Sequence, residues 1–165
     1  MTDKPRILDE PLLEFGDALT HQDPRRGLVD GGPHQANPGD RLTLGVAGSA
    51  SMIEKTEAFF EDIANGVESS AEKLPNMNPD FPGLRNRNPF RTQFTLTSDA
   101  HRTLTKQQIK SIVEEVDHEK AVDMACEAYM ELLTSLAESA DRPDLAIVAL
   151  PVEIIVRVKN AEIEG

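Results

Sequence analysis

The chain has 165 residues, a single cysteine and a formal net charge of −12, and 39% of its residues are hydrophobic. This length suits one domain that buries about 70% of the surface of its unfolded chain. One cysteine excludes an internal disulfide, no apolar run approaches the ~20 residues that span a bilayer, and the N-terminus lacks the apolar core of a signal peptide. We therefore expect a soluble, cytoplasmic protein without a membrane partner.

The first 40 residues are rich in proline, glycine and aspartate. Such a composition predicts short extended pieces joined by turns. Residues 12–15 predict one small strand, which ends at Gly16. We expect this extended N-terminal segment, residues 1–40, to pack on the domain that follows at residues 41–165, or on a partner.

Residues 42–47 are β-formers or small apolar residues, as in a strand that is buried on both faces. Gly48 then predicts a tight turn, and Ser51 and Glu54 have the spacing of a capping box at the start of a helix. A helix N-terminus presents unpaired N–H groups and partial positive charge, so Gly48, Ser49 and Ser51 form a candidate anion-binding turn. The alternative is structural, because any α/β domain contains such a turn.

The remaining elements alternate between strands and helices. Residues 90–96 alternate in polarity and predict a strand, and a second capping box predicts a helix over 105–115. An apolar stripe predicts a long helix over 118–139, residues 145–150 predict a second apolar strand, and 152–158 fit either a strand or a helix. This order predicts an α/β, Rossmann-like domain with a mostly parallel sheet and helices on both faces.

The charge is distributed unevenly along the chain. Residues 81–110, which we call the basic segment, have a net charge of +5, whereas 1–80 carry −8 and 111–165 carry −9. Part of the basic segment lies in a proline-rich loop over 75–89, and loops of that length are often functional. The simpler interpretation is a solvated loop that balances the acidic helix after it. Its basic residues are Arg85, Arg87, Arg91, Arg102, Lys106 and Lys110.

No catalytic constellation is visible in the sequence. The four histidines are scattered, no Cys-x-x-Cys is present, and the glycine-rich turn lacks the Lys-Ser/Thr of a phosphate-binding loop. The carboxylates fall mainly on the outer faces of predicted helices. We therefore expect a protein that is not an enzyme and has no metal site or cofactor of its own.

Five stretches together resemble one protein family, the prokaryotic Argonautes. In that family similar patterns form the segment before the MID domain, the first MID strand, and the strand that ends in Leu-Pro. Their order and spacing resemble most closely the short Argonautes, which lack the N and PAZ domains. The stretches are EPLLEFG at 10–16, HQDPRRGL at 21–28 with GP at 32–33, LTLGVAGS at 42–49, FPG and PFR within 81–91, and VALP at 148–151.

The resemblance implies a MID domain that holds the 5′-phosphate end of a single-stranded RNA or DNA guide and is non-catalytic by itself. A divalent cation at the 5′-phosphate is compatible with this. Because PIWI residues are not in the chain, we expect an incomplete MID-like domain that works with the remaining MID and PIWI part, with an effector subunit, or as a homo-oligomer. The candidate phosphate contacts are Arg85, Arg87, Arg91, Arg102, Arg157 and Lys159.

Two other functions fit the sequence. The chain could be a scaffold subunit of an Argonaute-like defence complex that does not touch nucleic acid, which its net charge and the acidic helix over 118–139 favour. Alternatively, the turn after residue 47 could bind a small nucleotide. The absence of a phosphate-loop lysine from that turn disfavours this second alternative.

Overall fold

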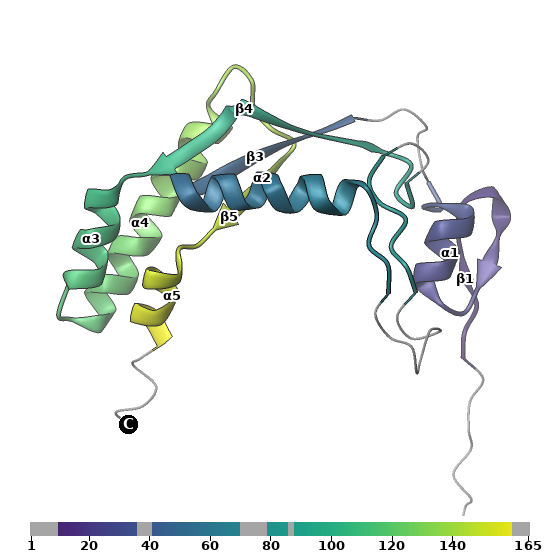
Figure 1. Ribbon diagram of the computed structural model, residues 1–165, viewed down its shortest axis with the longest axis horizontal. Coiled ribbons are helices and arrows are strands. Elements are labelled where there is room, and N and C mark those ends of the chain that lie inside the picture. Colours follow the sequence, from purple (N-terminus) through teal and green to yellow (C-terminus); the bar gives the residue numbers. More distant parts are fainter. Residues whose placement is uncertain (1–9, 36–40, 70–78, 86–87, 160–165) are drawn as a thin grey trace, which may run out of the picture. The chain divides into compact units, whose positions relative to one another are not determined.

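The computed structural model describes residues 10–35, 41–69, 79–85 and 88–159, and it defines the side chains of all of these except Lys159 (Figure 1). The chain forms two compact units. The N-terminal unit contains Met1–Asp40 and Ile63–Gln93, and the sheet unit contains Arg41–Asp62 and Phe94–Gly165. The described residues between 63 and 93 thus belong to the same unit as residues 10–35, although they follow the first long strand in the sequence.

The sheet unit contains strands β3 (Arg41–Ser49), β4 (Gln93–Leu104) and β5 (Leu145–Ala149), in the order β4-β3-β5. β3 and β5 are parallel, with register pairs from Leu44↔Leu145 to Gly48↔Ala149, and β4 runs in the same direction (Figure 1). The central strand is buried from Leu44 to Ser49, which explains its apolar sequence. This sheet confirms the expected α/β class.

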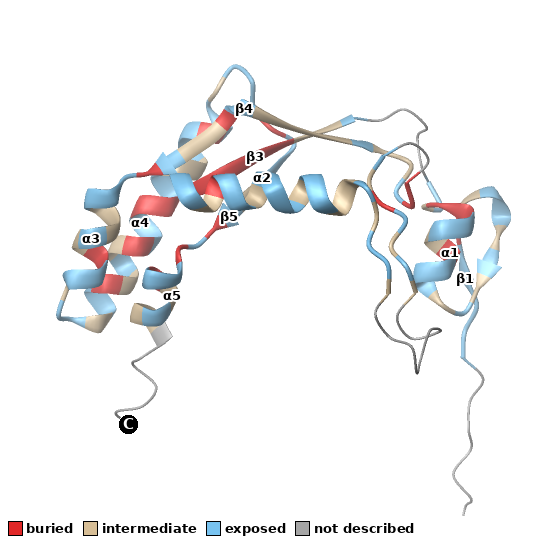
Figure 2. Ribbon diagram, in the orientation of Figure 1, coloured by how far each residue is buried: buried red, intermediate tan, exposed pale blue. Residues whose placement is uncertain are grey.

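Four helices accompany the sheet: α2 (Ala50–Ala64), α3 (Lys106–Glu114), α4 (His118–Ala137) and α5 (Val152–Lys159). Helix α2 packs on the sheet where Ile53 meets Val46 and Ala149. Helices α3, α4 and α5 share a second apolar cluster, and the buried positions line their facing sides (Figure 2). The cluster is built from Leu104, Ile112, Ala125, Ala128, Tyr129 and Ile154. Its formation decides the open question over 152–158 in favour of a helix.

Two predicted helix starts are confirmed. Thr105 and Gln108 form the expected capping box before α3, with Gln108 N donating to Thr105 Oγ1 at 3.2 Å and Thr105 N donating to Gln108 Oε1 at 2.9 Å. Asp117 caps α4 by accepting from Lys120 N at 3.2 Å. These local patterns form as predicted because a cap involves only residues that are three apart in sequence.

The N-terminal unit contains a short hairpin, β1 (Leu13–Glu14) with β2 (Thr20–His21), followed by helix α1 (Pro24–Gly31). A 3₁₀ turn, η1 (Gly16–Ala18), joins the two strands. The expectation of extended pieces is wrong over Pro24–Gly31. Asp23 accepts from the backbone N–H of Arg25 and Pro24 occupies the first helical turn, so Asp-Pro begins a helix here rather than a turn.

Candidate nucleic-acid interface

Three helices begin at one edge of the sheet. Helices α2, α3 and α5 follow directly after β3, β4 and β5. The last register pair of β3 and β5 is Gly48↔Ala149, and on the other side of β3 the Ala100 carbonyl lies against Gly45. The three helix N-termini therefore lie at the carboxyl edge of the sheet, where α/β proteins bind ligands and where helix dipoles present positive charge.

Gly48 does not form the tight turn that the sequence predicted. It lies inside β3, and a Cβ at this position would come within 2.5 Å of the Ala149 carbonyl oxygen. A glycine is therefore needed for the close approach of β3 and β5. The prediction failed because the constraint comes from a strand about 100 residues away in the sequence.

The cap of α2 also differs from the prediction. Ser51 lies inside the helix, so it cannot be the N-cap of a Ser51–Glu54 capping box. The buried Ser49 fills that role, because its Oγ accepts from Met52 N at 3.3 Å and lies 3.2 Å from Ser51 Oγ. Ser51 is exposed, and the first turn of α2 contains no acidic residue. The α2 N-terminus is thus exposed at Ser51 and carries no acidic residue in its own first turn.

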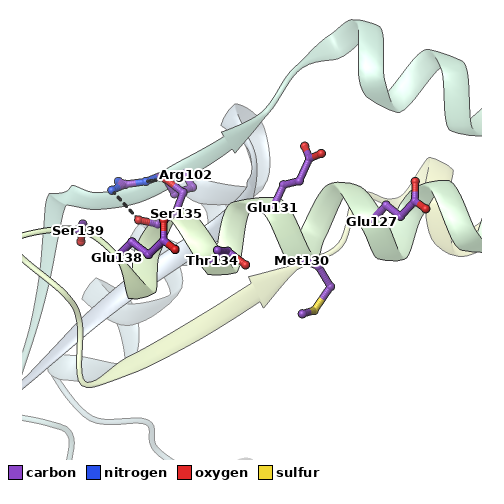
Figure 3. Close-up of a pocket in the computed structure, with 8 residues that line it drawn as sticks. All are labelled: Arg102, Glu127, Met130, Glu131, Thr134, Ser135, Glu138 and Ser139. Carbon is purple, nitrogen blue, oxygen red and sulfur yellow. Dashed lines mark hydrogen bonds between the residues drawn. The ribbon is translucent and has the colours of Figure 1, made fainter.

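Arg102 fastens β4 to the end of α4 (Figure 3). Its Nε donates to Ser135 Oγ at 2.9 Å, and its Nη1 donates to the carbonyl oxygens of Asp99 and His101 at 3.0 and 2.8 Å. Most of the guanidinium donors are therefore used inside the protein. The open groove beside Arg102, of ~770 Å³, is also lined by Glu127, Glu131 and Glu138, which would repel a phosphate.

Arg157 caps the end of α3. Its Nη2 donates to the Glu115 and Val116 carbonyl oxygens at 2.7 and 3.1 Å, and its Nε donates to Glu115 at 3.2 Å. Val116 precedes the start of α4 and Ser135 lies near its end, and at 1.5 Å per residue this helix is about 30 Å long. The structure therefore does not bring Arg102 and Arg157 together. The side chain of Lys159 lies outside the described part.

The other predicted contacts belong to the N-terminal unit. Arg91 has a φ of 55°, its Nη2 donates to the Asp30 carbonyl oxygen at 3.3 Å, and its side chain lies against Gly32. Arg85 is exposed. Arg87 lies outside the described residues. Arg91 thus ties the 88–92 turn to the end of α1, while Arg85 projects to solvent.

The hydrogen bonds of Arg91, Arg102 and Arg157 go to neutral acceptors, so they leave the positive charge of these side chains in place. Across the described ranges, no ion pair with a carboxylate is made by Arg85, Arg91, Arg102 or Arg157. Backbone carbonyls orient three of the guanidinium groups, but a carbonyl is a neutral acceptor. The charges of these four arginines are therefore not compensated by direct pairing within the described ranges, whereas Lys110 of the basic segment pairs with Glu114 at 3.7 Å.

Among the residues that the structure describes, two titratable groups have shifted pKa values, and both serve the fold. The backbone N–H of Arg25 lowers the pKa of Asp23, and burial raises the pKa of Tyr129. Both shifts move the group away from neutral pH, so neither prepares a general acid or base for chemistry at that pH.

The described ranges also limit metal and membrane binding. Within them, no three His, Cys, Asp or Glu side chains come together as ligands for a metal ion. No helix of those ranges combines the length and apolar character that crossing a bilayer requires.

Sequence reasoning missed a small apolar pocket in the N-terminal unit. It lies between α1 and residues 79–82 and 89–90, and its walls include Phe81 and Phe90. The FPG and PFR patterns are the only sequence feature at this pocket, and by themselves they indicate a family resemblance rather than a cavity. Pocket formation depends on how these segments fold back on α1, which no local pattern encodes.

No protein-family model and no curated protein sequence matches this chain. The resemblance to short Argonautes therefore stays a prediction from the residues that carry it.

Proposed function

We propose that this chain is a guide-binding module, non-catalytic by itself, that holds the 5′-phosphate of a single-stranded RNA or DNA at the carboxyl edge of its sheet. The observation that carries this proposal is the convergence of helix N-termini on that edge. Helix α2 is the best anchor, because Ser51 is exposed and its first turn has no acidic residue. Helix α3 is closed by its capping box, and α5 has Glu153 in its first turn.

The basic segment supports the same function in a different way. Arg85 and Arg87 would contact phosphates beyond the 5′ end, whereas the bonds of Arg91, Arg102 and Arg157 suit them to holding the fold. Phosphate contacts of this kind release counterions, so affinity should fall steeply with salt. The net charge of the whole chain is −12, so we expect it to bind the nucleic-acid backbone only weakly at non-specific positions. Any preference for one strand over another should therefore come from contacts with the 5′-phosphate.

Fluorescence anisotropy with matched 5′-phosphate and 5′-hydroxyl oligonucleotides tests this proposal. Ser51→Asp should weaken binding of the 5′-phosphate strand and leave the 5′-hydroxyl strand unchanged, because it places a carboxylate where the phosphate would sit. An acidic residue in the first helical turn stabilises a helix, so unfolding would not explain such a loss. Ser98→Asp on β4 is the matched control, since Ser98 is also exposed. Equal affinity of the wild-type chain for both strands would contradict the proposal.

A scaffold role is the second candidate, and the exposed edge of the sheet favours it. Among the described strands β5 is an edge strand, and Leu145 and Val148 are 51% and 44% exposed on it. Edge strands without charges or proline tend to pair with another chain. Light scattering that shows a stable oligomer, together with no oligonucleotide binding at low salt, would favour this role.

A further inference from the structure

The apolar pocket of the N-terminal unit lies between α1 and residues 79–82 and 89–90. Its volume is ~200 Å³, below the range of about 300–1,000 Å³ that holds drug-sized ligands. It therefore suits a single ring system rather than a whole nucleotide. Its walls come from Leu28, Val29, Pro79, Phe81, Pro82, Pro89 and Phe90, with Arg25 and Asp80 also lining it.

One wall is held in place by a buried amide. Asn88 is 5% exposed, and its Nδ2 donates to the carbonyl oxygens of Leu84 and Thr92 at 3.0 and 2.6 Å. Its Oδ1 accepts from Phe90 N at 3.0 Å. Three hydrogen bonds from one side chain thus fix the turn that presents the Phe90 ring.

The remaining walls are also braced. Phe81 and Val67 exchange two backbone hydrogen bonds, of 2.8 and 2.9 Å, in an isolated antiparallel bridge. The bond from Arg91 to the Asp30 carbonyl joins the 88–92 turn to α1. Because the walls are fixed before any ligand arrives, little conformational entropy is lost on binding.

From this geometry we propose that the pocket holds one unstacked nucleobase of the bound strand, with Phe90 and Phe81 as its stacking surface. The inference rests on the proposed function and adds a base-binding position to it. Aromatic side chains next to arginines are the usual platform for single-stranded nucleic acid. Arg25 and Asp80 bring one guanidinium and one carboxylate to the pocket. Arg25 Nε also pairs with Asp23 Oδ1 at 3.4 Å, and Asp80 Oδ1 accepts from Ser69 N at 2.7 Å.

A proline-rich peptide is the other ring-bearing ligand that an aromatic pocket can take. Grooves that bind proline-rich peptides usually contain tyrosine or tryptophan, because each combines a flat ring with a hydrogen-bond donor for the peptide backbone. The chain has no tryptophan, and its one tyrosine, Tyr129, belongs to the sheet unit. The pocket is lined by one arginine and one aspartate, and none of its lining residues offers such a ring donor, which favours the nucleobase.

The test uses the full chain and a set of 5′-phosphorylated 12-nucleotide strands, each with 2-aminopurine at a different position. Stacking on Phe90 should quench 2-aminopurine at one position. Phe90→Ala should abolish that quenching and lower affinity about 5- to 150-fold, the effect of losing one base–aromatic stack. Phe90→Tyr should retain both. Phe59→Ala is the control, because Phe59 is 57% exposed on α2, in the sheet unit.

Methyl NMR spectra separate the outcomes. Shifts at Leu28 and Val29 on adding the oligonucleotide, but not on adding decaproline, support the proposal. Binding with a 5′-phosphate preference but no shift at these methyls overturns the base pocket and leaves the proposed function intact. Shifts with decaproline alone identify a peptide site and overturn it as well. No oligonucleotide binding at all overturns both proposals.

Discussion

The hydroxyl of Tyr129 donates a hydrogen bond of 3.0 Å to the carbonyl oxygen of Ala149. This bond joins the middle of α4 to the last residue of β5, immediately before α5 begins at the carboxyl edge of the sheet. Ala149 also faces Gly48 across the β3–β5 pair. A single carbonyl group therefore lies where α4, the central strand and the candidate anion-binding edge meet.

Tyr129→Phe should destabilise the protein by about 1–3 kcal/mol, because it leaves a buried carbonyl without its partner. Tyr129 is itself buried, so the ring packing would be retained. Urea unfolding followed by circular dichroism measures the change. An unchanged free energy of unfolding would show that water replaces the hydroxyl.

The stability of the protein should also fall in alkaline solution. Burial raises the pKa of Tyr129 above its ordinary value of 10.0, so the unfolded chain loses this proton at a lower pH than the folded chain. The contribution of Tyr129 is therefore complete below pH 10 and is lost as pH rises through the folded pKa. Unfolding curves between pH 8 and about 11.5 should show a steeper decline for the wild type than for Tyr129→Phe.

Gly48→Ala should cost about 1–3 kcal/mol of stability, in the range of overpacked sites. The new Cβ would lie 2.5 Å from the Ala149 carbonyl oxygen, and that atom belongs to the backbone and cannot move aside. Thermal unfolding detects the loss, with Ser98→Ala on exposed β4 as the comparison. If Gly48 instead served only as a flexible turn, the substitution would leave strand pairing and stability nearly intact.

The arginines should separate into two groups in binding experiments. Arg85→Ala should reduce the slope of log affinity against log salt by about 0.7–0.9, as expected for one lost phosphate contact. Arg102→Ala and Arg157→Ala should leave that slope unchanged and lower the free energy of unfolding, because their donors serve backbone carbonyls and Ser135. A reduced slope for Arg157→Ala would show that this side chain reaches the nucleic acid.

Much of the fold could be predicted from short-range patterns. The caps at Thr105 and Asp117, the strand at 145–149 and the long helix α4 follow the sequence closely. Strand β4 was less predictable: it begins at Gln93 rather than residue 90 and runs on to Leu104. Its second half alternates poorly in sequence but buries Ala100 and Leu104 against neighbouring elements.

The sequence by itself determined the class of the fold, since periodicity, capping residues and charge act between residues a few positions apart. It also determined that residues 81–110 are basic. Only the tertiary structure decided what each arginine does, because Arg102 meets Ser135 and Arg157 meets Glu115 across 33 and 42 residues. It likewise decided that Gly48 serves strand packing, since hydrogen bonds and close contacts depend on distance in space rather than on distance along the chain.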